Sequence, residues 1–222
     1  MTVVKSEHGA SARRIADGVR EAILAGEFGP GQRVRQEMIA AQYGASRVPV
    51  REALRILEAE GLVTLVANTG AWVSRLSLPE CEELYQVRER IEPLLLRFSI
   101  PNLSGETIAE LHRLADEMEA GTDVEAFLRL DREFHWLSYS GADTIVLGET
   151  VQRLWNATQH YRRAFTRLFT RQEDRAVHHE QHLIAHAIER QDAEEAERVL
   201  YGHIRRTRLE LARHSEVFEH TD

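Results

Sequence analysis

The sequence predicts a mainly α-helical protein of two domains, in which one short β-hairpin interrupts the helical periodicity. Two observations support this prediction. Residues 1–76 contain three helix-like segments followed by two β-rich runs, whereas residues 77–222 contain only apolar stripes with helical spacing. A chain of 222 residues, of which 43% are hydrophobic, is long enough to bury two cores. We therefore expect a first domain over 1–76 and an all-helical bundle over 77–222.

Three helices are expected before the hairpin. Ser11–Gly26 carries one apolar stripe and ends at a glycine, as helices commonly do. A second, shorter helix covers about Gln36–Tyr43. Ser46 is a favourable N-cap residue for a third helix, which tolerates Pro49 in its first turn and continues to about Glu60. Together these segments describe a compact helical domain.

A β-hairpin and a long helical region follow. Leu62–Val66 and Ala71–Arg75 are β-rich runs on either side of the turn sequence Ala67–Gly70. Ser77 and Glu80 have the spacing of a capping box, which predicts the start of a long helix. From there on, the apolar stripes predict six helices and no strand, at about 78–99, 105–120, 123–140, 144–170, 173–190 and 193–214.

Composition and charge exclude several classes of protein. No apolar run approaches the roughly 18 residues that a membrane-spanning helix needs, and the first residues lack the pattern of a secretory signal. A lone cysteine, Cys81, fits a reducing compartment. The net charge is −8, but residues 1–77 contain 10 Lys and Arg against 8 Asp and Glu, whereas residues 78–222 contain 18 against 28. We expect a cytoplasmic protein, not associated with a membrane, whose slightly basic first domain is compatible with DNA binding.

The order short helix, tight turn, second helix is the helix-turn-helix plan, in which the second helix enters the major groove. Arg47 and Arg51 lie one turn apart on that helix, away from the apolar stripe, and arginine can bind guanine or phosphate. The hairpin is then expected to be a wing that contacts the DNA backbone or minor groove. The alternatives are a merely solvated helix face or a winged helix that binds protein. The residues expected to contact double-stranded DNA are Arg35, Ser46, Arg47, Pro49, Arg51, Asn68, Thr69 and Gly70.

Two longer segments resemble known families. GPGQRVRQEMIAAQYGA followed by SRVPVREALRILEAEGLV and the hairpin resembles the DNA-binding domain of GntR-type regulators, over about residues 11–76. The remainder, with LYQVRERIEPLLLR, DREFH and AIERQDAEEAERVLYGHI, resembles the FadR-like (FCD) effector-binding domain. The resemblance implies a transcriptional repressor or activator that binds a pseudo-palindromic operator as a homodimer. It also implies control by a small metabolite, often an organic or sugar acid.

A metal site is a second expectation for the bundle. Asp131 and His135 are four residues apart on a helix face that also carries apolar side chains, and His203 lies on another apolar stripe. Buried polar groups need partners, and metal coordination provides them. The FCD resemblance implies one divalent ion, such as Zn, Ni or Mn, bound by an Asp, a His four residues later and two further histidines. Asp131, His135 and His203 match three of these places, whereas the remaining place falls on Gln181 instead of a histidine.

Three interpretations of these residues are open. Gln181 or water completes the metal shell, or His178 or His182 rotates inward and takes the place of the missing histidine. Otherwise the cluster binds no metal, and its polar groups form hydrogen bonds with an effector or with one another.

Arginines in the bundle leave a further choice. Arg88 and Glu92 are expected to form an exposed i, i+4 pair. Alternatively, Arg88 faces a pocket and, with Gln181, binds an acidic effector; Arg162 and Arg163 pose the same choice.

A metal-dependent enzyme fused to a DNA-binding head is the competing function. Asp131, His135 and His203 have the composition of a two-histidine, one-carboxylate triad. However, the sequence contains no paired Glu-x-x-His motif, nucleophile elbow or P-loop. We therefore expect a regulator and not an enzyme.

Overall fold

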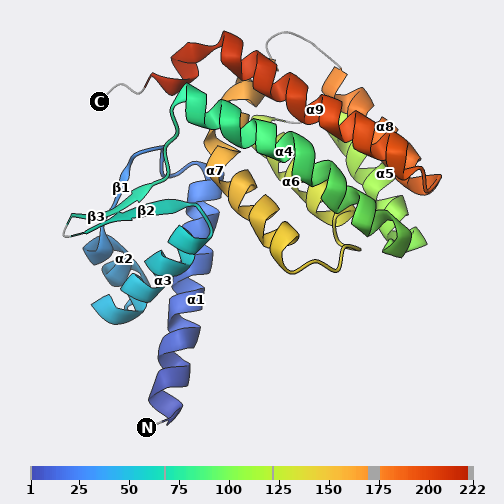
Figure 1. Cartoon of the computed structure of the whole chain (residues 1–222). Coiled ribbons are helices and arrows are strands. Elements are labelled where there is room, and N and C mark those ends of the chain that lie inside the picture. The colour runs from blue at the N-terminus through green and yellow to red at the C-terminus, as the bar shows by residue number, and fades with distance from the viewer. Residues whose placement is uncertain (1, 68, 122, 170–175, 220–222) are drawn as a thin grey trace. The chain divides into compact units, whose positions relative to one another are not determined.

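The computed structural model describes residues 2–67, 69–121, 123–169 and 176–219, and it divides into two compact units (Figure 1). The first unit comprises Met1–Leu76 together with Gln152–His160, and the second comprises Ser77–Val151 together with Tyr161–Asp222. The chain thus passes from the first unit to the second between Leu76 and Ser77. A short stretch of a later helix also belongs to the first unit.

In the first unit, the part of residues 1–76 that the structure describes contains three helices: α1 (Thr2–Ala25), α2 (Gln36–Tyr43) and α3 (Arg47–Ala59). α1 packs against α3, and buried aliphatic side chains from both helices join the core of this unit. α1 begins at Thr2 and not at Ser11, where the sequence predicted its start. Among the side chains of α1 that the structure describes, which start at Gly9, the first buried one is Ala12, and the apolar stripe that predicted the helix lies from there on.

The tight turn between α2 and α3 depends on Gly44. This residue has a left-handed conformation (φ 59°, ψ 34°), and its N–H donates to the carbonyls of Ala40 and Ala41. Glycine adopts this conformation without steric cost, which lets α2 end and the chain turn at once into α3. Ser46 stands at the predicted N-cap position of α3, but its side chain accepts no capping hydrogen bond from the described backbone.

A three-stranded antiparallel sheet completes the first unit, in the order β1 (Arg33–Val34), β3 (Gly70–Val73), β2 (Val63–Val66). The hairpin β2–β3 was predicted, whereas β1 was not. β1 has only two residues, too few to show an alternating pattern, and it exists because Arg33 and Val34 pair with Trp72 and Ala71 of β3.

Among its described residues, the second unit contains six α-helices: α4 (Leu78–Ser99), α5 (Gly105–Glu119), α6 (Val124–Ser138), most of α7 (Val146–Phe169), α8 (Ala176–Glu189) and α9 (Ala193–Arg213). All six were predicted, and their ends differ from the prediction by at most three residues. α4 lies alongside α9, and α5 packs against α6 and α8 (Figure 1). Two short 3-10 helices, Ile100–Asn102 and Ser215–Phe218, follow α4 and α9.

The start of α4 has the predicted capping box. The Ser77 hydroxyl accepts from the Glu80 N–H, and the Glu80 carboxylate accepts from the Ser77 N–H at 2.7 Å. This reciprocal arrangement satisfies two backbone donors at the beginning of the helix. Across the described part of the chain, no helix is long and apolar enough to cross a membrane.

Candidate DNA-binding face and buried polar cluster

The exposed side of α3 lines a groove of about 560 Å³ in the first unit. The groove is rich in arginine and contains one acidic side chain, Glu37. Arginine carries a permanent charge and a fork of donors that matches phosphate and the edge of guanine. The five arginines that line the groove are Arg33, Arg35, Arg47, Arg51 and Arg55.

The sequence of α3 separates an exposed, arginine-rich side from a core side. Arg47, Arg51 and Arg55 recur every four residues and are exposed. Val50, Leu54 and Leu57 lie on the opposite side, and each is at most 1% exposed. Because this separation follows the helical repeat, an arginine can be shortened without disturbing the core.

Ser46 is exposed at the beginning of α3. Since its side chain does not cap the helix, its hydroxyl and the first N–H groups of α3 are suited to bind a phosphate. Pro49, which was also predicted to contact DNA, is not exposed. It is buried at the third position of α3, because the turn of the helix places it on the core side and not beside Arg47.

The wing is held in place by an arginine that sequence reasoning missed. Arg33 donates to the carbonyl of Thr69 at 2.8 Å, and its guanidinium lies over the Trp72 ring at 5.7 Å. Gly70 has φ 130°, a conformation that side chains rarely adopt, and it lies beside the Arg33 guanidinium. Thr69 is exposed, whereas Asn68, also predicted to contact DNA, lies outside the described residues. The role of Arg33 could not be predicted, because it depends on the pairing of strand β1, which the sequence did not reveal.

In the second unit, four predicted side chains converge in the interior. Asp131 and His135 come from α6, Gln181 from α8 and His203 from α9, and all four are buried. One ligand atom each from Asp131, His135 and His203 lie within 4.8 Å of one another. The Gln181 amide N–H donates to Asp131 Oδ1 at 3.0 Å. Gln181, and not His182, is therefore the residue of α8 that faces Asp131.

The neighbouring histidines of α8 do not join this group. His182 points to α5, where its Nε2 lies 2.9 Å from Glu119 Oε2. The side chain of His178 lies outside the described part of the chain.

Both imidazoles of the cluster are neutral at pH 7. Burial lowers the pKa of His135 to about 4, although Glu92 partly opposes this effect. Burial likewise lowers the pKa of His203 to about 4, against a hydrogen bond to Glu180 that raises it. A neutral imidazole has the lone pair that a metal or a hydrogen-bond donor requires.

Second contacts orient both rings. His135 Nδ1 lies 3.4 Å from the Tyr139 hydroxyl, and His203 Nδ1 lies 2.7 Å from Glu180 Oε2. In each ring, Nδ1 is therefore engaged outside the cluster, and Nε2 is the nitrogen left to bind a ligand within it. Metal-binding histidines typically use their other nitrogen in this way.

These residues fit a divalent cation. His135 Nε2 and Asp131 Oδ1 are 3.4 Å apart, which is about the edge of a tetrahedron with ligands 2.1 Å from its centre. In addition, Gln181 Oε1 is buried and accepts no hydrogen bond from any residue that the structure describes. A buried acceptor in this position could be a ligand.

Arginine also enters the cluster. Arg162 of α7 forms an ion pair with the second oxygen of Asp131, and this contact was not predicted. Burial, together with the nearby Arg88, lowers the pKa of Arg162. Arg163 instead pairs with Glu125, with both contacts at 2.8 Å. The sequence left the roles of Arg162 and Arg163 open, and the structure distinguishes them by the side of α7 that each occupies.

The expectation of an exposed Arg88–Glu92 pair is wrong. Arg88 Nε donates to Glu92 Oε1 at 2.5 Å, and the two residues are 2% and 0% exposed. The Tyr139 hydroxyl donates to the other oxygen of Glu92 at 3.0 Å. Because α4 is covered by other helices on this side, the pair became part of the interior. Tyr139 connects it to His135.

Comparison with known families gives the identity. Residues 83–206 match the FCD domain, and residues 11–73 match the bacterial regulatory proteins of the gntR family. The chain belongs to the GntR family, as a member with an FCD domain. Its helix-turn-helix is therefore a DNA-binding domain, and the protein is a transcriptional regulator.

Individual relatives agree with this assignment. The chain is 30% identical over 158 residues to the Nta operon transcriptional regulator of Aminobacter aminovorans, covering 70% of this chain and 72% of that protein. It is 31% identical over 123 residues to the HTH-type transcriptional regulator YdhC of Bacillus subtilis (strain 168), an alignment that spans about half of both proteins, 54% of this chain and 55% of YdhC.

Solved structures show the same fold. McbR/YncC of E. coli superposes with a TM-score of 0.80 at 22% identity, covering 92% of this chain and 98% of that one. A GntR-type regulator from Rhodococcus sp. RHA1 superposes with a TM-score of 0.76 at 25% identity, covering 91% and 98%.

Proposed function

We propose that this regulator reads its operator with Arg47 and Arg51, which contact base edges in the major groove. The observation that carries the proposal is the arginine-lined groove formed by the exposed side of α3 and the wing. Arg35, Ser46 and the wing tip at Thr69 and Gly70 contact the phosphate backbone, and Arg33 supports the wing. Since bacterial DNA is in the cytoplasm, the protein acts there.

Fluorescence anisotropy with DNA from upstream of the chain's own gene tests this proposal, with scrambled DNA of equal length as the control. Binding should weaken steeply with salt, because each neutralised phosphate releases counterions. Arg35→Ala should lower the slope of log affinity against log salt by about 1 and weaken all sequences alike. Equal affinity for operator and scrambled DNA at all salt concentrations would refute operator recognition.

A homodimer is proposed as the DNA-binding form, because two-fold dimers read the two halves of a pseudo-palindromic operator. α4 offers a surface for a second copy. Val87, Leu94 and Phe98 lie within about 40° of one another around the helix and are 45%, 40% and 49% exposed. Exposed apolar side chains that gather on one helix face often mark an interface.

Sedimentation of the full chain tests this arrangement. The wild type should sediment at about twice 25.4 kDa, and a Leu94→Asp/Phe98→Asp variant should sediment as a monomer. Leu183→Asp is the matched control, because Leu183 is 48% exposed on a different helix. A wild type that is monomeric at all concentrations would refute the homodimer. A dimer that survives the double substitution would refute the choice of α4.

The buried cluster is proposed as the effector site. Asp131, His135, His203 and the amide oxygen of Gln181 would hold a divalent metal such as Zn, Ni or Mn. A cation held there would supply a Lewis-acidic centre with open positions for the carboxylate or hydroxyl of a small acid.

Arg162 is the residue that would bind the effector's carboxylate. Its guanidinium is already beside Asp131, and a buried cation requires an anionic partner. Arg88 is paired with Glu92 and would not contact the effector directly. Its charge adds to the positive potential around Arg162. The effector is therefore expected to be a small organic or sugar acid.

A thermal-shift screen of small carboxylates and sugar acids, with and without added metal, tests this part. Active compounds should raise the unfolding midpoint of the second unit and change operator affinity in the anisotropy assay. A compound that raises the midpoint equally in an Arg162→Met variant would refute the role of Arg162. Stabilisation that persists in chelator would refute the role of the metal.

A further inference from the structure

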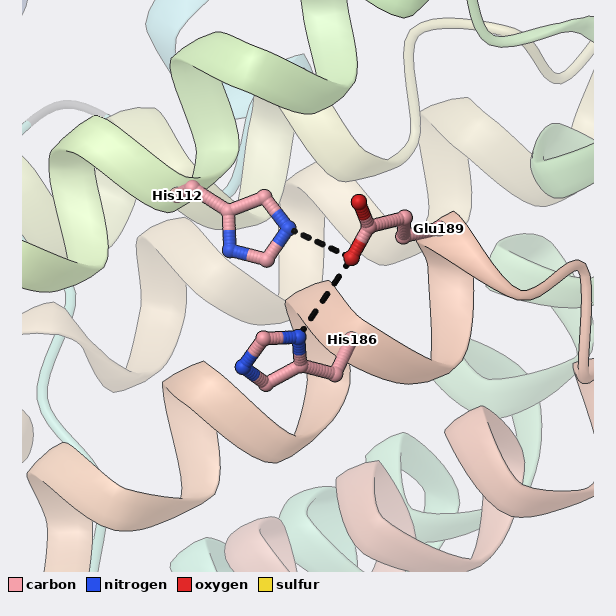
Figure 2. A group of neighbouring side chains, drawn as sticks. All are labelled: His112, His186 and Glu189. Carbon is pink, nitrogen blue, oxygen red and sulfur yellow. Dashed lines mark hydrogen bonds and ion pairs between the residues drawn. The ribbon is translucent and has the colours of Figure 1, made fainter.

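A second group of histidine and carboxylate side chains lies at the surface of the second unit, away from the buried cluster. His112 comes from α5, whereas His186 and Glu189 come from α8. Figure 2 shows one oxygen of Glu189 between the two imidazoles. Glu189 Oε2 lies 3.3 Å from His112 Nε2 and 3.4 Å from His186 Nδ1.

We propose that His112, His186 and Glu189 form a surface zinc site that connects α5 to α8. Ligands of tetrahedral zinc lie about 2.0–2.2 Å from the metal, so they are separated from one another by about 3.4 Å. Two of the three edges in this group already have that length. The third pair, the two imidazole nitrogens, lies within 4.8 Å, so a modest side-chain rotation completes a face of the tetrahedron.

The ligand set favours zinc over calcium and magnesium. Two imidazoles and one carboxylate suit zinc, whereas calcium and magnesium prefer oxygen ligands. His112 is about one quarter exposed, and His186 and Glu189 are about half exposed, so water can occupy the fourth position. His186 and Glu189 are therefore accessible to a cation, whereas the His112 Nε2 atom is buried and accepts no hydrogen bond from the residues that the structure describes.

The surroundings favour a cation. The two imidazole rings lie 4.8 Å apart between centroids and are tilted by 56° to each other, so both are close to the Glu189 carboxylate. The acidic residues Asp116 and Glu119 follow His112 on α5, one and two turns later. Both lie within 4 Å of His182. Without a cation, Glu189 forms only a hydrogen bond with His186 and an ion pair with His112 in the described part of the chain.

Zinc at this site would act on the helix that forms one wall of the buried cluster. α8 carries Gln181 inward and His186 outward, and α5 is the neighbour to which the site would tie it. A ligand that binds only the folded chain stabilises it by mass action. Zinc would therefore stabilise the position of α8 from outside, independently of any effector.

Zinc titration of the full chain, freed of metal with chelator, tests the proposal. Calorimetry gives affinity and stoichiometry, and cobalt substituted for zinc gives the visible absorption of a tetrahedral site. An Asp131→Asn/His135→Ala background removes two ligands of the buried cluster. In that background one equivalent of zinc should still bind, and His112→Ala or Glu189→Gln should weaken it by about tenfold or more.

His182→Ala is the matched control, because His182 lies one turn before His186 on α8 and contacts acidic residues without belonging to the group. It should leave zinc affinity and the cobalt spectrum unchanged. If the background double variant fails to fold, the same substitutions in the wild type should remove one of the zinc equivalents. Zinc binding that is unaffected by both His112→Ala and Glu189→Gln, or reduced equally by His182→Ala, would overturn the assignment.

Discussion

Replacement of Arg162 by methionine distinguishes the two possible charged partners of Asp131, which are the Arg162 guanidinium and a bound metal ion. Asp131 is 1% exposed and is held by Arg162, by the Gln181 amide at 3.0 Å and by His135 at 3.4 Å. Methionine preserves much of the volume of arginine but removes the charge. In chelator, the variant therefore leaves a buried carboxylate with one neutral hydrogen bond and a neutral imidazole.

The expected cost follows from the burial of this carboxylate. Removal of one partner of a buried ion pair typically costs 3–5 kcal/mol. We expect about 3 kcal/mol here, because the Gln181 hydrogen bond remains. For a chain of this size, 1 kcal/mol corresponds to a change in Tm of about 2–4 °C, so Tm should fall by roughly 6–12 °C. A metal that binds Asp131 competes with Arg162 in the wild type but not in the variant.

Differential scanning fluorimetry in chelator and in excess zinc measures both effects. In chelator, the variant should have the lower Tm. Addition of excess zinc should raise the Tm of the variant by more than it raises the Tm of the wild type. Arg163→Met is the matched control, since Arg163 pairs with Glu125 away from the cluster. An equal Tm for the Arg162→Met variant and the wild type in chelator would contradict the buried ion pair. An equal gain from zinc would contradict competition at Asp131.

Three further outcomes are expected. Arg47→Ala or Arg51→Ala should each weaken operator binding by about 1–3 kcal/mol in anisotropy titrations and leave Tm unchanged, because both side chains are exposed; unchanged affinity in both variants would contradict the placement of α3 in the major groove. Gln181→His should tighten metal binding in calorimetry, because imidazole is a better ligand than an amide oxygen for zinc or nickel; weaker binding would contradict a ligand role for this position. Burial raises the pKa of Cys81 to about 12. Its alkylation at pH 8 should therefore be about 1,000-fold slower than in urea, where the pKa is near 9. Since only the unfolded state releases this proton above pH 9, the free energy of unfolding should also fall faster from pH 9 upward in the wild type than in Cys81→Ala. Rapid alkylation of the folded chain would contradict this reasoning.

The sequence alone determined the helices, apart from the start of α1, and the β2–β3 hairpin. Apolar stripes, glycines and the Ser77–Glu80 capping box are local signals, and they placed all six helices of the second unit within three residues of their ends. Arg47 and Arg51 could likewise be assigned to the exposed side of α3, because helical periodicity relates each residue to the apolar stripe. The convergence of Asp131, His135, Gln181 and His203 followed from the same reasoning, applied to helices with a known resemblance.

Only the tertiary structure decided which polar groups meet. β1 exists through its pairing with β3, so Arg33 could not be recognised as the support of the wing. Arg88 and Glu92 look like a surface pair from their spacing, but neighbouring helices bury them. Arg162 pairs with Asp131, which lies 31 residues away on another helix. His112 pairs with Glu189, which lies 77 residues away. Helical spacing reports on neighbours one turn away, whereas the charge that a buried arginine or histidine finally meets depends on how whole helices pack together.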